Sequence, residues 1–239
     1  MESTPGLRPL YRQVYDYLIR QIAEGVWRPA AALPSEQALA AELGVSQGTV
    51  RKALDVMAAE QLIERRQGKG TFVAEHTQES ALFRFFRIAA PGGKRTTPQC
   101  GQETVRLRPA KPQEQRHLHL SENQEIVEIK RTRLIEGVPA IFEIIIIPHA
   151  LFPGIDQRGE LPNTLYSLYQ SDYGINIVAA EEELRADVAR KEDVKRINVP
   201  LGAPLLHIDR IALALDGTRV EWRISRCDTR DFVYAVTIS

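Results

Sequence analysis

The sequence predicts an α+β fold in two parts, because the spacing of its apolar residues changes along the chain. Within the first 75 residues, apolar side chains recur at helical intervals between capping residues and glycines. Beyond Pro98, long apolar runs are bounded by turn residues, which is typical of antiparallel strands with a few short helices. This order indicates a small helical unit followed by a larger unit built around one antiparallel sheet.

Length and composition suit two cores and exclude several classes of protein. The chain has 239 residues, 44% of them hydrophobic, and its 31 Lys and Arg residues balance 31 Asp and Glu residues. No apolar stretch is long enough to span a membrane and no secretory signal follows Met1, so we expect a cytoplasmic protein with no membrane partner. Cys100 and Cys227 lie far apart and form no zinc or disulfide pattern, so we expect neither a metal nor a cofactor.

Capping residues divide the first part into three predicted helices. Residues 10–24 are amphipathic and are expected to close a small core. Ser35 is suited to cap a second helix that ends at Gly44, and Ser46 is suited to cap a third helix almost at once. Two helices joined by a short turn that contains glycine form the geometry that lays the second of them across a DNA major groove.

A short hairpin is predicted after the third helix. Residues 62–66 and 71–73 read as strands, and the tip between them holds two glycines and Lys69. Such a tip suits close approach to a phosphate backbone or to a minor groove. Between Val45 and Val73, basic side chains outnumber acidic ones, so the positive potential is local in a neutral chain. The alternative is that these charges are the solvated faces of an ordinary helical domain.

Together these residues resemble the GntR family of bacterial winged-helix repressors. The resemblance is carried by Pro9, Leu10 and Tyr11, by Gly25 and Trp27, and by the motifs LPSE, LGVS, TVRKAL and GKGTFV. It implies that the first part binds double-stranded operator DNA through the second and third helices and the hairpin. The positions it assigns to DNA binding are Ser35, Gln37, Ser46, Gln47, Gly48, Thr49, Arg51, Lys52, Arg65, Arg66, Gly68, Lys69 and Gly70.

Two of these positions depart from the pattern of the family. Gln47 stands where many relatives have arginine, and Gln37 stands where some relatives have it. Glutamine pairs with adenine, whereas arginine pairs with guanine. The departures therefore predict an altered operator sequence rather than a loss of DNA binding.

The second part is predicted to be an antiparallel sheet with three helices. Strands are expected at residues 103–108, 125–135, 139–147, 178–187, 205–215, 219–227 and 232–238, and helices at 113–119, 164–172 and 191–197. We divide the chain into a DNA-binding domain at 1–75, a linker at 76–90 and a second domain at 91–239. Leu82, Phe83, Phe85 and Phe86 form an aromatic and apolar cluster in the linker, which we expect to dock onto its own sheet or onto a partner subunit.

A carboxylate in an apolar strand marks a candidate site in this second part. Glu143 lies in the run IFEIIII, where a charge is costly unless a cation or a ligand compensates it. A two-residue loop at 136–137 would pair Glu143 with Lys130, whereas a three-residue loop with a glycine bulge would set it opposite Arg131, on one face with Arg133. The second register predicts either an anion pocket or a structural salt-bridge network, and the residues alone leave both open.

The second part resembles the UTRA domain, the effector-binding half of the HutC subfamily. The motifs RTR, EGVPA, PNTLYSLY, AEEELRA, GAPLL and VEWR carry this resemblance over most of residues 90–238. It implies the fold of chorismate lyase and the binding of a small metabolite without turnover, at the amino terminus of a helix near residue 164. The positions it assigns to effector binding are Arg131, Arg133, Glu143, Thr164, Tyr166, Glu221 and Tyr234.

The combined features predict a ligand-responsive transcriptional regulator. We expect a homodimeric repressor, associated with the bacterial nucleoid, that leaves a near-palindromic operator when it binds a phosphorylated sugar, a carboxylate or a phosphonate. A lyase-like enzyme domain fused to a DNA-targeting module is the alternative, but no nucleophile with a neighbouring base is evident in the sequence. A constitutive architectural DNA-binding protein is a third reading.

Overall fold

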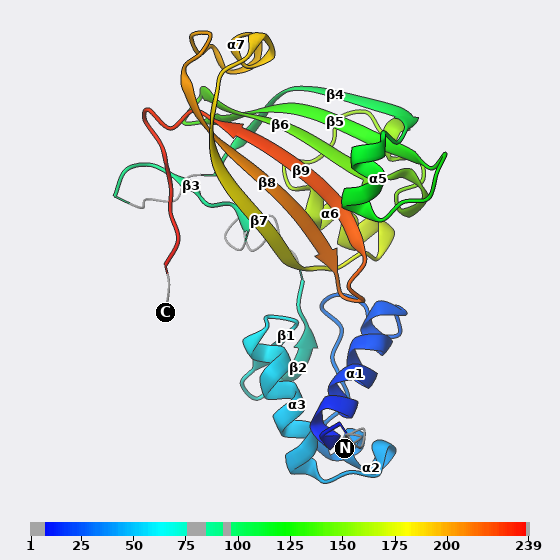
Figure 1. Cartoon of the computed structure of the whole chain (residues 1–239). Coiled ribbons are helices and arrows are strands. Elements are labelled where there is room, and N and C mark those ends of the chain that lie inside the picture. Colours follow the sequence, from blue (N-terminus) through cyan, green and yellow to red (C-terminus); the bar gives the residue numbers. More distant parts are fainter. Residues whose placement is uncertain (1–7, 76–84, 93–96, 238–239) are drawn as a thin grey trace, which may run out of the picture.

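The computed structural model describes residues 8–75, 85–92 and 97–237. It shows a small helical unit at one end of a larger unit built on a twisted sheet (Figure 1). Of the predicted linker cluster, Leu82 and Phe83 lie outside the described residues.

The small unit is a winged helix-turn-helix, as predicted. It contains α1 (Leu10–Ala23), α2 (Glu36–Leu43) and α3 (Gln47–Ala59), followed by the hairpin of β1 (Ile63–Arg66) and β2 (Gly70–Val73). The Ser35 and Ser46 hydroxyls each accept a hydrogen bond from a first-turn amide at 3.1 Å, and Gly44 ends α2 at a φ of 64°. The Ser35 cap therefore fixes the start of α2, and Gly44 and the Ser46 cap fix the turn between α2 and α3.

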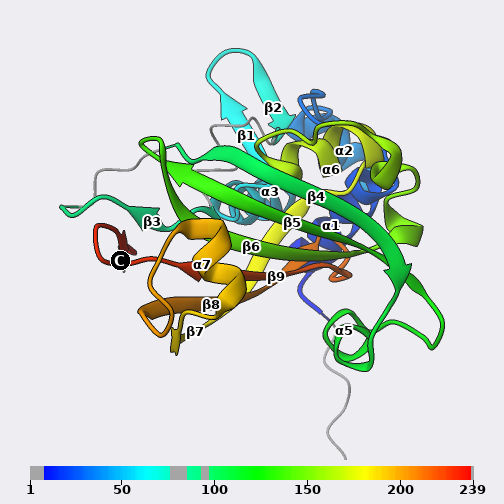
Figure 2. The ribbon, with the colours of Figure 1, turned by 90° about the horizontal axis from the view of Figure 1, so that it is seen from above.

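The large unit is a six-stranded antiparallel sheet in the order β4-β5-β6-β9-β8-β7. Its strands are β4 (Gln99–Pro109), β5 (Glu125–Ile135), β6 (Val138–Pro148), β7 (Ile177–Val188), β8 (Pro204–Ala214) and β9 (Arg219–Cys227). The helices α5 (Pro112–Leu118) and α7 (Lys191–Ile197) lie on one face, and α6 (Leu165–Tyr173) lies on the other (Figures 1 and 2). Two short 3₁₀ helices, η1 (His149–Leu151) and η2 (Ile155–Gln157), follow β6.

The face that carries α6 holds the main core of this unit. Phe152, Leu165, Tyr166 and Tyr169 pack there against Val127, Ile129 and Ile145 of the central strands. We call this face the inner face. Because side chains alternate along a strand, Arg131, Glu143 and Arg223 also project from it.

The predicted strand at 232–238 was wrong in extent and in pairing. Over the described part of that range, 232–237, only Val233–Tyr234 form a strand, β10, and it pairs with β3 (Ile88–Ala89) in a separate two-stranded sheet. The chain leaves the main sheet after β9 because the Asp228 carboxylate accepts a hydrogen bond from the Arg230 amide at 3.1 Å and closes a turn. β10 therefore holds the end of the linker segment and does not extend the main sheet.

The β5–β6 hairpin has the second of the two predicted registers, in which Glu143 lies opposite Arg131. A β-bulge, and not a three-residue loop, produces this register. The loop has only two residues, Glu136 and Gly137, at φ values of 52° and 81°. A β-bulge then leaves Ala140 without a partner on β5, and the Asp228 amide donates to the Ala140 carbonyl at 2.9 Å. This one-residue shift sets Arg131 opposite Glu143.

The two units contact each other at the base of the sheet. Val178 and Leu215 of the large unit pack against the core of the winged helix. The Gln170 amide nitrogen of α6 donates to the Ala74 carbonyl, directly after β2, at 3.2 Å. α6 is therefore in contact with the base of the wing.

Candidate DNA-binding surface and anion cleft

One carboxylate joins α3, the recognition helix, to the β1–β2 hairpin, which is the wing. Glu36 Oε2 accepts hydrogen bonds from Arg51 Nε and Nη2 at 3.0 and 2.9 Å and from Gln47 Nε2 at 3.3 Å, while Arg65 Nη1 lies 3.4 Å from Glu36 Oε1. The hydrogen bond from Arg51 is the largest cause that lowers the pKa of Glu36. Three of the predicted DNA-binding side chains are therefore held in one place by Glu36, which was not among the predicted DNA-binding residues.

The remaining predicted DNA-binding residues fall into two groups. Ser35 and Ser46 use their hydroxyls as helix caps, and Lys52 lies over the Tyr11 ring at 4.4 Å. Exposed or half-exposed positions on the same helices and on the wing are Gln37, Gly48, Thr49, Arg66, Gly68, Lys69 and Gly70.

The wing tip has the backbone that its glycines predicted. Gly68 and Gly70 have φ values of 70° and 113°, which a residue with a Cβ adopts only with strain. Arg66 lies over the Phe72 ring at 4.5 Å, and Arg65 donates to Asp55 at 2.7 Å. The strand arginines are thereby held in place, and the tip presents Lys69.

A cleft between the inner face and α6 gathers most of the predicted effector-binding residues. It encloses about 590 Å³ of empty space, open solvent included. Predicted residues that line it are Arg131, Arg133, Glu143, Thr164, Tyr166 and Tyr234. Glu221 does not line it.

Three charged side chains in the cleft satisfy one another. Arg131 Nε donates to Glu143 Oε2 at 3.1 Å, and Arg223 Nη1 donates to Glu143 Oε1 at 3.2 Å. Burial would raise the pKa of Glu143, but the charges of Arg223, Arg131 and Arg133 outweigh burial and lower the pKa to about 2. This part of the cleft is the structural salt-bridge network that was one of the two predicted alternatives.

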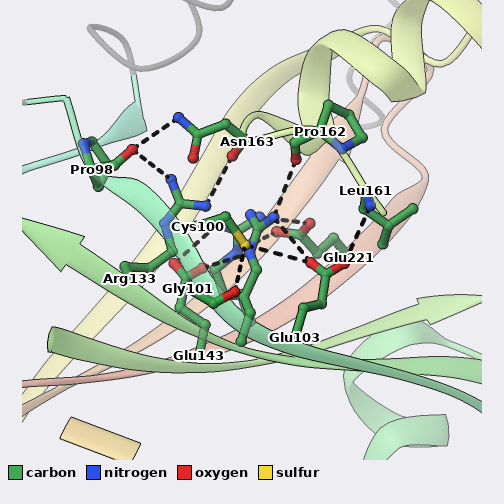
Figure 3. A network of polar contacts seen from close by, with 12 residues as sticks. Pro98, Cys100, Gly101, Glu103, Arg133, Glu143, Leu161, Pro162, Asn163 and Glu221 are labelled. Atoms are coloured by element: carbon green, nitrogen blue, oxygen red, sulfur yellow. Dashed lines mark hydrogen bonds and ion pairs between the residues drawn. The ribbon is translucent and has the colours of Figure 1, made fainter. Parts of the chain in front are cut away.

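Arg133 is different, because its donors meet only neutral groups (Figure 3). Its Nη1 and Nη2 donate to the main-chain carbonyls of Asn163 at 2.9 Å and Pro98 at 3.4 Å. Among the described residues, no carboxylate forms an ion pair with it and its Nε has no hydrogen-bond partner. Burial and the neighbouring charge of Arg131 lower the pKa of this guanidinium to about 10. A buried cation in this condition is stabilised by an anion.

Two more polar atoms beside Arg133 lack partners. Thr164 Oγ1, at the amino-terminal cap of α6, and Asn163 Oδ1 are buried and make no hydrogen bond with any residue that the structure describes. Both residues line the cleft with Arg133. Buried polar atoms are nearly always paired in folded proteins, so this cluster indicates a place for a ligand.

Glu221 lies beneath the cleft, fully buried. It accepts hydrogen bonds from the hydroxyls of Tyr166 at 3.0 Å and Tyr169 at 2.8 Å and from Arg223 Nε at 2.9 Å. Its lone pairs are therefore occupied, and its role in this structure is to orient Tyr166 and Arg223.

Two arginines that line the cleft were not predicted from the sequence. Arg210 and Arg223 face each other across β8 and β9, and both line the cleft. The signal was available, because Arg223 lies two residues after Glu221 and strand alternation places both on one face. Arg210 pairs with Glu182 at 2.5 Å and also donates to the Phe85 carbonyl.

The described part of the linker docks onto its own sheet, one of the two predicted possibilities. The Phe85 ring meets the Tyr166 ring edge-on, with centroids 5.0 Å apart. Phe85, Phe86 and Ile88 form part of the cleft wall. The described end of the linker therefore lies against the cleft.

Comparisons with known proteins agree with this architecture. A model of the gntR family of bacterial regulatory proteins matches residues 10–73, and a model of the UTRA domain matches residues 94–232. The mannosyl-D-glycerate transport/metabolism system repressor MngR of Escherichia coli K12 is 28% identical, over 97% of this chain and 96% of its own length. The histidine utilization repressor of Pseudomonas putida is 32% identical, over 86% of this chain and 82% of its own length.

A solved structure shows the same fold for the second part. The ligand-binding domain of a GntR-family transcriptional regulator from Bordetella bronchiseptica matches with a TM-score of 0.59 and 26% identity, covering 65% of this chain and 98% of that one. The chain therefore belongs to the GntR family of bacterial regulatory proteins and carries the UTRA domain of the HutC subfamily, so both resemblances are confirmed. It is a ligand-responsive, DNA-binding transcriptional regulator and not an enzyme. No helix in the described residues is long and apolar enough to cross a membrane.

Substitution of Glu143 tests the buried charge network. We expect Glu143→Gln to reduce the free energy of unfolding at neutral pH by about 3 kcal/mol, because Arg131 and Arg223 lose their shared carboxylate. The pKa of Glu143 is lowered from 4.5 to about 2 on folding, so its contribution is fully present above about pH 5 and is lost as pH falls toward 2. Denaturant unfolding of both proteins across this range measures the difference.

The exposed turn residue Glu136 supplies the matched control. Glu136→Gln should unfold at neutral pH with the wild-type free energy. A Glu143→Gln protein that is equally destabilised at pH 7 and at pH 2 would contradict the pairing described for Glu143.

Proposed function

We propose that the chain is a homodimeric repressor that binds a near-palindromic operator and is released by a small anionic metabolite. The observation that carries the proposal is the buried Arg133 guanidinium, which has neutral partners only among the described residues. An anion in the cleft supplies the missing countercharge. The relatives named as repressors of metabolic systems support the direction of control.

The DNA side of the proposal rests on α3 and the wing. Gln47 and Arg51 project from the first turns of the recognition helix, where base edges are read, and Lys69 at the wing tip meets a phosphate or the minor groove. A two-fold dimer presents two such surfaces to two half-sites. We keep the division into residues 1–75, 76–90 and 91–239, with action at the bacterial nucleoid in the cytoplasm.

The effector side of the proposal centres on one end of the cleft. Arg133 and Thr164 hold the anionic group, the free amides at the start of α6 add further donors, and Arg131 contributes positive charge. Tyr166 and Tyr234 form walls for the rest of the effector, whether it is a phosphorylated sugar, a carboxylate or a phosphonate. Glu143 and Glu221 act by holding the arginines and Tyr166, not by direct contact with the effector, which revises the assignment taken from the resemblance.

α6 provides the route between effector and DNA. Thr164 lies at its start in the cleft, and Gln170, about 9 Å further along the helix axis, donates to the Ala74 carbonyl at the base of the wing. An anion that draws the start of α6 toward Arg133 moves the helix as a rigid unit. The contact with Ala74 then changes, and with it the placement of the winged helix.

Removal of Arg51 tests the DNA-binding surface. We expect Arg51→Ala to weaken binding to an operator selected from random duplexes roughly 10-fold or more, because one major-groove contact and the link to Glu36 are lost. Arg158→Ala, which breaks an exposed ion pair with Asp172 on the large unit, is the control and should bind as wild type. Equal operator affinity for all three proteins in a gel-shift titration would refute the assignment.

Removal of Arg133 tests the anion site. A thermal-shift screen of phosphorylated sugars, carboxylates and phosphonates should raise the melting temperature of the wild-type chain with at least one compound. Arg133→Ala should lose that shift yet retain operator affinity, because the winged helix is unchanged. If the variant kept the same shift with the same compound, the anion site would lie elsewhere.

Removal of the Gln170 side chain tests the coupling. Gln170→Ala should bind both the metabolite and the operator, but the metabolite should change its operator affinity about 10-fold less than it does for wild type. Ser171→Ala, at the next position of α6, is the matched control and should respond fully. Full response by Gln170→Ala would exclude α6 as the route.

A further inference from the structure

The orientation of the Asn163 side-chain amide is fixed by the main-chain carbonyl of Pro98. Its Nδ2 donates to the Pro98 carbonyl at 2.9 Å, and Arg133 Nη2 donates to the same oxygen at 3.4 Å. A carbonyl oxygen only accepts hydrogen bonds, so a reversed amide would set two acceptors against each other. Asn163 must therefore present its nitrogen to Pro98, and its oxygen is turned toward the interior, on the side of Arg133 (Figure 3).

The three unpaired atoms at this end of the cleft have different requirements. Arg133 Nε can only donate, the Thr164 hydroxyl can donate or accept, and Asn163 Oδ1 can only accept. All three are buried and have no partner among the described residues. An anion with acceptors alone satisfies Arg133 and Thr164 but leaves the Asn163 oxygen without a donor, which costs roughly 10-fold in affinity.

We propose that the charged end of the effector carries a hydrogen-bond donor beside its negative charge, and that Asn163 selects for that donor. Two chemical groups have this character: a phosphate monoester that keeps a proton, and a carboxylate with an adjacent ammonium group. A sulfate ester or a simple carboxylate lacks the donor. The inference rests on the proposed anion site and adds the specificity of that site.

Four simple probes of the full-length chain test the inference. At neutral pH inorganic phosphate carries at least one proton, whereas sulfate carries none and has the greater average charge, so charge alone favours sulfate. Calorimetric titration should show phosphate binding roughly 10-fold more tightly than sulfate, or glycine binding roughly 10-fold more tightly than acetate. The first result would identify the charged end of the effector as a protonated phosphate, and the second would identify it as a carboxylate with an adjacent ammonium group.

Substitution of Asn163 separates its role from that of the anion site. Asn163→Ala removes the acceptor but keeps the main-chain carbonyl that holds Arg133. The affinity for the preferred probe, phosphate or glycine, should therefore fall to within about 3-fold of the affinity for sulfate or acetate. Sulfate and acetate should bind the variant as they bind wild type. Asn123→Gly, in the exposed turn before β5, is the control and should retain the preference.

The outcomes distinguish this inference from the proposed function. If wild type binds phosphate and sulfate equally, and glycine and acetate equally, the donor requirement is overturned while the anion site stands. If Asn163→Ala keeps the wild-type preference, Asn163 is not the selecting residue. If none of the four probes binds and Arg133→Ala behaves as wild type with every anion tested, the anion site itself fails.

Discussion

The register of the β5–β6 hairpin is the constraint on which the cleft depends. Glu136 and Gly137 close a two-residue turn, which alone would pair Glu143 with Lys130 on the outer face of the sheet. The bulge at Ala140 shifts β6 by one residue and brings Glu143 to the face that carries Arg131 and Arg133. Without the extra residue at the bulge, Arg131 and Arg223 would lose the carboxylate that they share.

The distribution of charge in the cleft follows from this register. Glu143 compensates Arg131 and Arg223, Glu221 also binds Arg223, and Glu182 pairs with Arg210. These carboxylates neutralise Arg131, Arg223 and Arg210 within the fold, so the cleft is not positively charged throughout. Within the part of the chain that the structure describes, positive charge remains uncompensated at Arg133, beside the start of α6. The Gln170 side chain of the same helix donates to the Ala74 carbonyl at the base of the wing, so the proposed function makes α6 the link between effector binding and DNA binding.

Local signals in the sequence predicted most of the winged helix. Ser35, Gly44 and Ser46 each act through contacts within four residues, so their positions sufficed to place α2 and α3. The long strands were also evident, because alternation and apolar runs are properties of the strand itself. The second part could be placed as an antiparallel sheet for the same reason.

Features that depend on distant contacts were not predictable. The Ala140 bulge is held by the Asp228 amide from the end of β9, and β10 is defined by its pairing with β3. The resemblance assigned Glu221 to effector binding, but its carboxylate accepts hydrogen bonds from the hydroxyls of Tyr166 and Tyr169 on α6. Most positions taken from the resemblance gather in one cleft, but the division between residues that hold the cleft and residues with unpaired donors or acceptors required the structure.

The most direct test of the central claim is a measurement on the Arg133 Nε–H group itself. In a ¹⁵N-labelled full-length chain, with the resonance assigned through Arg133→Lys, inorganic phosphate should shift the Arg133 Nε–H signal in a saturable manner. The Arg131 Nε–H signal should change little, because it is already bonded to Glu143. An Arg133 signal that stays fixed while the anion alters operator affinity would contradict the account.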